Sequence, residues 1–161
     1  MVKKRGEQQP WMSAPDYGRS LRGLSINLLV KDVARAIAFA REVLGATLVY
    51  GDADFAVLRR DGAEWMLHAD HTYGDHPLLA LTGDGALRGA GVEIRMHDHD
   101  PDAAAETAAR LGHTVLAAAA DKPHGLREVY IADSRRLCLG AGPSAEGLTE
   151  NKVLCPQARG G

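Results

Sequence analysis

The chain has little cysteine, little net charge and no long apolar run. Cys138 and Cys155 are the only two cysteines among 161 residues, and their spacing is not of a metal-binding type. We therefore expect a reduced, cytoplasmic protein. The formal net charge of −2 gives no basic field for holding nucleic acid. Because no apolar stretch reaches the length of a membrane span, we expect neither a membrane nor a nucleic-acid partner.

Both ends of the chain lack hydrophobic periodicity. Residues 1–20 mix Gly, Pro, Gln and charged residues, and are predicted to form a flexible N-terminal arm without the apolar segment of a secretory signal. Residues 143–161 are predicted to form a flexible C-terminal tail. The whole chain is 45% apolar and 25% charged, which is typical of a globular protein. Residues 21–142 are therefore expected to form the folded domain.

The folded part opens with the pattern of a strand and a helix. Ile26, Leu28 and Val30 fall on one face of a predicted strand, and the polar Ser25 and Asn27 fall on the other. Asp32 stands where a helix N-cap is expected, and apolar side chains recur at helical spacing over residues 33–44. Three further strands are predicted at about residues 47–51, 55–60 and 63–69.

The second half of the chain repeats this order. Residues 91–96 alternate as a strand, and residues 101–111 form an alanine-rich helical pattern. Each predicted helix ends in a Leu-Gly pair, and these pairs, at Gly45 and Gly112, lie 67 residues apart. Self-similarity at a fixed spacing indicates a duplicated unit. We therefore predict an α+β chain of two modules, at about residues 22–82 and 88–142.

Three segments resemble the vicinal oxygen chelate superfamily, which groups glyoxalases, extradiol dioxygenases and bleomycin resistance proteins. They are INLLVKDVARAIAF at 26–39, FAVLRRDGAEWMLH at 55–68 and DKPHGLRE at 121–128. The last two resemble the bleomycin-resistance-like branch most closely. The turn after Asp133 departs from the usual family pattern. The resemblance implies two βαβββ modules whose curved mixed sheets surround a concave cleft, in a domain-swapped or side-by-side homodimer.

Metal-using members of the superfamily place His, Gln or Glu at four points of this cleft. The resemblance puts those points at Ser25, Met66, Gly91 and Gly140. Serine and methionine are poor ligands for a divalent cation, and glycine has no side chain. We therefore expect no metal and no other cofactor.

The strand faces opposite the predicted helices are expected to line a pocket. Alternation places Glu64, Met66 and His68 on one such face, and Glu93 with Arg95 on another. An equally supported interpretation is that these charged groups only satisfy one another on a half-exposed sheet. His124 and Arg127 join the set through the resemblance alone. The predicted ligand-binding residues are Ser25, Asn27, Phe55, Glu64, Met66, His68, Glu93, Arg95, His124 and Arg127.

Two aromatic residues of the first half have different predicted roles. Phe55 begins a strand near Asp52 and Asp54, where a ring beside acidic groups suits a planar cationic molecule. A purely structural role for Phe55 is equally open. Trp65 alternates with Leu67 onto the helix-packed face, which favours a place in the core.

The favoured function is metal-independent binding and sequestration of a small organic molecule, such as an antibiotic, as the resemblance to bleomycin resistance proteins implies. The alternative is an enzyme of the superfamily, a lyase, isomerase or dioxygenase. In that case His68 or Glu93 would act as the general base, and Arg95 would stabilise an enolate or oxyanion. A third hypothesis is a non-catalytic partner protein that makes its contacts through the two chain ends.

Overall fold

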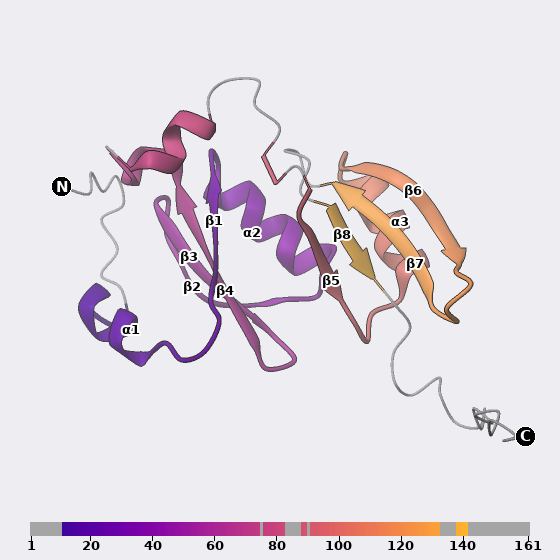
Figure 1. Ribbon diagram of the computed structural model, residues 1–161, viewed down its shortest axis with the longest axis horizontal. Coiled ribbons are helices and arrows are strands. Elements are labelled where there is room, and N and C mark those ends of the chain that lie inside the picture. Colours follow the sequence, from indigo (N-terminus) through magenta and orange to yellow (C-terminus); the bar gives the residue numbers. More distant parts are fainter. Residues whose placement is uncertain (1–10, 75, 83–87, 90, 133–137, 142–161) are drawn as a thin grey trace, which may run out of the picture.

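The chain folds into two βαβββ modules that lie side by side (Figure 1). The computed structural model describes residues 11–74, 76–82, 88–89, 91–132 and 138–141. The first module contains β1 (Ile26–Val30), α2 (Val33–Glu42), β2 (Thr47–Gly51), β3 (Phe55–Arg60) and β4 (Ala63–Ala69). The second contains β5 (Glu93–Met96), α3 (Pro101–Arg110), β6 (Thr114–Asp121), β7 (Arg127–Ala132) and β8 (Cys138–Ala141). The prediction of an α+β fold with two such modules is confirmed.

Each module forms one four-stranded mixed sheet. Sheet A has the order β1-β4-β3-β2 and sheet B the order β5-β8-β7-β6. The first strand of each module runs parallel to the last, and the other pairs are antiparallel. The register places Asn27 opposite Met66 in sheet A and Arg95 opposite Gly140 in sheet B. The sequence repeat is therefore a repeat of strand order and of pairing.

Local residue choices set the ends of the elements in the first module. Asp32 caps α2, because its carboxylate accepts a hydrogen bond from the backbone N–H of Arg35 at 2.9 Å. Asp61 and Gly62 have φ angles of 46° and 81°. Two successive positive values are what a type I′ turn requires, so these residues connect β3 to β4 directly.

The core lies on the helix side of both sheets. Buried side chains of α2, α3 and the two sheets form one cluster, and Trp65 packs against it as predicted for a core residue. The modules meet through these helix sides. His99 Nε2 lies 2.7 Å from the carbonyl oxygen of Val43, and the rings of Phe39 and His113 are 4.6 Å apart. The strand faces opposite the helices therefore do not form the contact between the modules.

The prediction of a flexible arm is wrong for residues 14–20, which form helix α1 (Ala14–Ser20). Ser13 caps this helix by accepting a hydrogen bond from the N–H of Asp16, and Pro15 occupies its first turn. Tyr17 is buried, and its hydroxyl donates to Glu64 at 2.8 Å. This contact with β4 stabilises a helix that sequence periodicity does not reveal.

Residues 1–10 of the predicted arm and the predicted tail at 143–161 lie outside the described residues. In the part of the chain that is described, no helix has both the length and the hydropathy of a membrane span.

Candidate functional site

The face of sheet A opposite α2, here called outer face A, gathers five of the predicted ligand-binding residues. The register places Phe55 opposite His68, and Asn27 opposite Met66. Glu64 lies two residues before Met66 on β4 and therefore shares its face. The alternate residues of the same strands belong to the core cluster. Strand alternation thus brings these five side chains together, as the sequence predicted.

His68 lies near the end of β4 on outer face A. Its Nδ1 is 2.6 Å from Oδ1 of Asn27, whose amide nitrogen donates to the hydroxyl of Tyr73. An amide oxygen only accepts hydrogen bonds, so Nδ1 carries the proton and Nε2 keeps its lone pair. The ring centroids of Phe55 and Tyr73 lie 4.5 and 5.2 Å from the imidazole. Burial lowers the pKa of His68 to about 4, so the imidazole is neutral at pH 7.

A row of aromatic rings crosses outer face A. The chain has only two Trp, two Phe and four Tyr residues, and five of these eight lie in the row. Tyr50 lies 4.9 Å from Trp11 and 6.2 Å from Phe55 between ring centroids, and Tyr17 lies 6.0 Å from Phe55. Tyr73 extends the row on the far side of the imidazole. The scarce aromatic residues are therefore concentrated on one surface.

The acidic residues near Phe55 are engaged in internal contacts. Asp52 accepts hydrogen bonds from the Tyr50 hydroxyl at 2.6 Å and from the N–H groups of Asp54 and Phe55. Burial, together with the bond to Asp52, raises the pKa of Tyr50 to about 12. Asp54 is buried, and its carboxylate lies 2.7 Å from Nε2 of His71. These carboxylates therefore hold the turn before β3 in place.

The face of sheet B opposite α3, here called outer face B, carries a charged cluster around Glu128. The Glu128 side chain is only 3% exposed and is bound by the Arg95 guanidinium. His124 Nε2 lies 2.9 Å from its carboxylate, and the Tyr130 hydroxyl donates to it at 3.0 Å. Contacts with His124, Tyr130 and Arg95 hold the pKa of Glu128 below its usual value, against the effect of burial. Arg95 also donates to Glu93 at 3.0 Å.

Gly140 of β8 lies between Arg95 and the strand that carries Glu128. It pairs with Arg95 on one side and with Tyr130 on the other. Because glycine has no side chain, the Arg95 side chain can cross β8 to reach Glu128 on β7. A predicted metal-ligand position is thus the place where an arginine passes over the sheet.

Arg127 lies away from both outer faces, and Ser25 lies beside outer face A, before its first strand. Arg127 donates to Asp102 at 2.6 and 2.8 Å and to Asp121 at 3.1 Å, so its side chain ties β7 to α3. Ser25 is exposed and lies one residue before β1. The remaining eight divide between outer face A and the cluster around Glu128.

The residues at the four predicted metal-ligand positions do not fit a divalent metal. Ser25 and Gly91 are exposed and lie before β1 and β5, while Met66 and Gly140 lie within β4 and β8. None of the four supplies a carboxylate, imidazole or thiolate. Within the described ranges, no three or more His, Cys, Asp or Glu residues are grouped so as to hold a metal ion.

Sequence reasoning missed Trp11 and the four tyrosines of these faces. Tyr50 follows an irregularity in strand pairing between Leu48 and Tyr50, which breaks the alternation that assigns side chains to faces. Tyr130 could have been found, because it lies between two buried apolar residues of β7. Its alternation with those residues places it on the face opposite α3.

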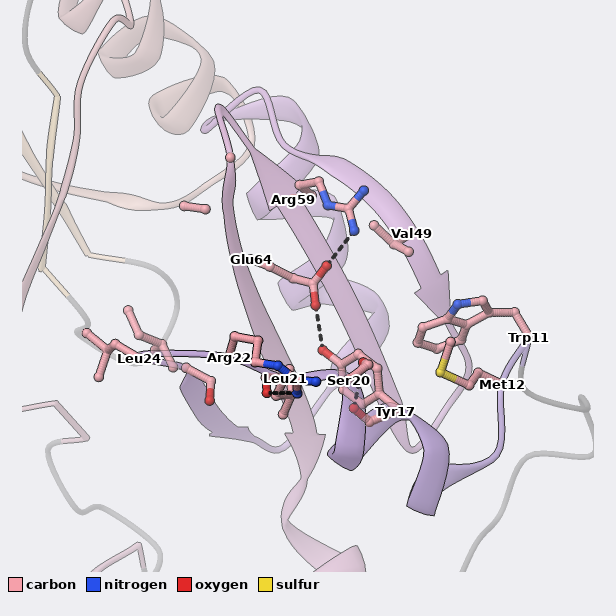
Figure 2. Close-up of a pocket in the computed structure, with 14 residues that line it drawn as sticks. Trp11, Met12, Tyr17, Ser20, Leu21, Arg22, Leu24, Val49, Arg59 and Glu64 are labelled. Carbon is pink, nitrogen blue, oxygen red and sulfur yellow. Dashed lines mark hydrogen bonds and ion pairs between the residues drawn. The ribbon is translucent and has the colours of Figure 1, made fainter.

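Two cavities adjoin these surfaces. One, of about 580 Å³, lies between β1 and β5 and is lined mainly by apolar side chains such as Leu28, Trp65 and Ile94. The other, of about 490 Å³, lies between the N-terminal segment and outer face A (Figure 2). Glu64 and Ser25 belong to its lining.

No family model and no curated protein sequence matches the chain. Solved structures do match it. A glyoxalase/bleomycin resistance protein/dioxygenase family enzyme from Burkholderia phytofirmans PsJN is 14% identical over 74% of this chain and 96% of its own, with a TM-score of 0.62. TioX from Micromonospora sp. ML1 is 19% identical over 77% of this chain and 99% of its own, with a TM-score of 0.56. A lactoylglutathione lyase from Agrobacterium tumefaciens is 18% identical over 80% of this chain and 98% of its own, with a TM-score of 0.52.

The chain therefore has the fold of glyoxalase/bleomycin resistance/dioxygenase proteins. The fold that the sequence resemblance implied is confirmed.

Proposed function

We propose that this protein binds and sequesters a small organic molecule on outer face A, without a divalent metal. The observation that carries the proposal is the environment of His68. Its imidazole is neutral, and Asn27 fixes the proton on Nδ1. No described residue forms a hydrogen bond with Nε2. A hydrogen-bond acceptor held in place between two aromatic rings suits recognition of a ligand.

The surroundings of His68 indicate what such a ligand looks like. Phe55 and Tyr73 supply ring surface, and Met66 supplies an adaptable apolar side chain next to them. Small-molecule sites typically combine such apolar surface with a few polar groups that fix orientation. We therefore propose a flat, largely apolar ligand, such as an aromatic antibiotic, with one N–H or O–H group that donates to Nε2.

A homodimer is part of the same proposal. The modules of one chain meet through their helix sides, so outer face A and outer face B of that chain do not cover each other. A second chain would supply an outer face B, with Arg95 and Glu128, to enclose a ligand on outer face A. The resemblance of the sequence to bleomycin resistance proteins also implies a homodimer.

Calorimetric titration with a panel of aromatic antibiotics tests the proposal. The protein is first dialysed against a chelator, and binding of at least one compound is expected to persist. Replacing His68 with leucine should weaken that binding about tenfold, since a hydrogen bond with a well-aligned partner is lost. The control is Arg127→Gln, because Arg127 lies on the α3 side of sheet B. Absence of binding to every compound, or full binding by the His68 variant, would contradict the proposal.

The enzyme alternative has less support from the geometry. His68 belongs to outer face A, whereas Glu93 and Arg95 belong to outer face B. Within one chain His68 is therefore apart from Arg95, and the two would meet only across the proposed homodimer. A base whose conjugate acid has a pKa of about 4 is also weak at neutral pH.

A further inference from the structure

The N-terminal segment builds a pocket that the two modules alone do not have. Trp11, Met12 and Tyr17 lie over outer face A, and Val49 and Arg59 line the same cavity from β2 and β3. Its volume of about 490 Å³ falls within the range of small-molecule sites. Figure 2 shows Glu64 between Arg59 and Tyr17, with Trp11 and Met12 on one side of the tyrosine and Arg22 on the other.

The charged groups of the pocket favour an anion. Its described lining contains two guanidinium groups, Arg22 and Arg59, and one carboxylate, Glu64. Both oxygens of Glu64 are engaged, one by the Tyr17 hydroxyl at 2.8 Å and the other by Arg59 at 2.7 Å. A cation would have to displace these donors. An anion would not.

Hydrogen-bond donors remain for such an anion. A guanidinium has five N–H groups, and the bond to Glu64 uses one of those of Arg59, whose side chain is 58% exposed. Arg22 uses one nitrogen, Nη1, for the carbonyl oxygens of Arg19 and Leu21. Arginine donors match carboxylate and sulfonate oxygens in geometry as well as in charge.

The other walls of the pocket favour a flat apolar body. Trp11 is 45% exposed, and its indole ring lies against Tyr50 with 4.9 Å between ring centroids. Met12 and Val49 extend this apolar wall. A large aromatic surface that is left half-exposed at the edge of a cavity can stack with a ligand ring.

We propose that this pocket is a second binding site, for an aromatic molecule that carries one carboxylate or sulfonate group. Arg59 and Arg22 bind the anionic group, and Trp11 and Met12 contact the ring. The site is distinct from the one around His68, because it needs the N-terminal segment and an anionic ligand. The proposal of this second site does not depend on the proposal for the site around His68.

Two fluorescent probes that differ in charge test the proposal on the full chain. Anilinonaphthalene sulfonate is an aromatic anion, and phenylnaphthylamine is its neutral counterpart. We expect the wild-type protein to bind the anion about tenfold more tightly than the neutral probe. Arg59→Gln should weaken binding of the anion about tenfold and leave the neutral probe unchanged. Trp11→Leu should weaken both, and Arg19→Gln, at an exposed residue outside the pocket, should change neither.

Two results would overturn the proposal. One is equal affinity of the wild-type protein for both probes. The other is anion binding that neither Arg59→Gln nor Arg22→Gln weakens, which would place the probe in the apolar cavity between β1 and β5. Circular dichroism of each variant excludes loss of fold as the cause of weakened binding. The antibiotic titration with His68→Leu is scored separately, so failure at one site is distinguishable from failure at the other.

Discussion

Replacing His68 with glutamine is expected to remove a pH dependence of stability that this imidazole creates. The pKa of His68 is lowered to about 4 in the folded protein, from an ordinary value of 6.5. Between these pH values the unfolded chain binds a proton on the imidazole that the folded chain does not, so acidification favours unfolding. The wild-type protein should therefore lose stability as the pH falls from 6.5 toward 4. Above 6.5 the imidazole is neutral in both states and contributes no such loss.

The magnitude follows from the difference between the two pKa values. One pKa unit corresponds to about 1.4 kcal/mol, so acidification from about pH 7 to about pH 5 would cost at most about 2 kcal/mol through His68. Water reaches part of the ring and screens the effect, because His68 is not fully buried. We therefore expect about 1 kcal/mol of the loss in unfolding free energy to come from this residue.

Urea unfolding at both pH values measures how much of the loss in unfolding free energy comes from His68. The loss between about pH 7 and about pH 5 is determined for the wild type and for His68→Gln, and the difference between the two losses is the contribution of His68. The exposed His97 provides the matched control, since His97→Gln should keep the wild-type loss. An identical loss in the wild type and in His68→Gln would refute the reasoning. So would a His68 NMR resonance that titrates near pH 6.5.

Three further changes probe other parts of the fold. Tyr17→Phe removes the hydroxyl that donates to Glu64 but keeps the ring, so amide exchange in α1, followed by mass spectrometry, should become about tenfold faster, with β3 unchanged. Leu58→Ala empties a fully buried site and should lower the unfolding free energy in urea by about 2–5 kcal/mol. Asp100→Ala removes the N-cap of α3 and should cost about 1 kcal/mol in the same assay. Unchanged values would contradict these assignments.

The central hairpin of the first module could be predicted from its sequence because local and global signals agree there. Two alternating segments flank Asp61 and Gly62, and only a few residue pairs favour the left-handed backbone of a two-residue turn. The predicted strands at 55–60 and 63–69 match β3 and β4. Since the turn fixes the register, it also fixes which residues face the helix and which face outward.

Helix α1, and the side of sheet A to which Tyr50 points, could not be predicted in the same way. A helix of seven residues is not stable by itself in water, and α1 depends on a contact between Tyr17 and Glu64 that lies 47 residues away in sequence. The Ser13 cap was a local sign of it. The irregularity before Tyr50 reverses a face assignment without any distinctive residue. The position of Arg127 on the helix side of sheet B, by contrast, could have been predicted from the sequence. Arg127 directly precedes Glu128 in β7, so the two side chains point to opposite faces.

The division into two sheets has a consequence for how the chain folds during synthesis. In the ranges that the structure describes, strands 1 to 4 pair only with one another, as do strands 5 to 8. Sheet A can therefore be complete before β5 leaves the ribosome, and its long-range pairings need nothing from the second module. The part of α2 around Phe39 stays uncovered on one side until His113 of the second module arrives. A nascent first module thus exposes an apolar surface on α2, where a chaperone would be expected to bind.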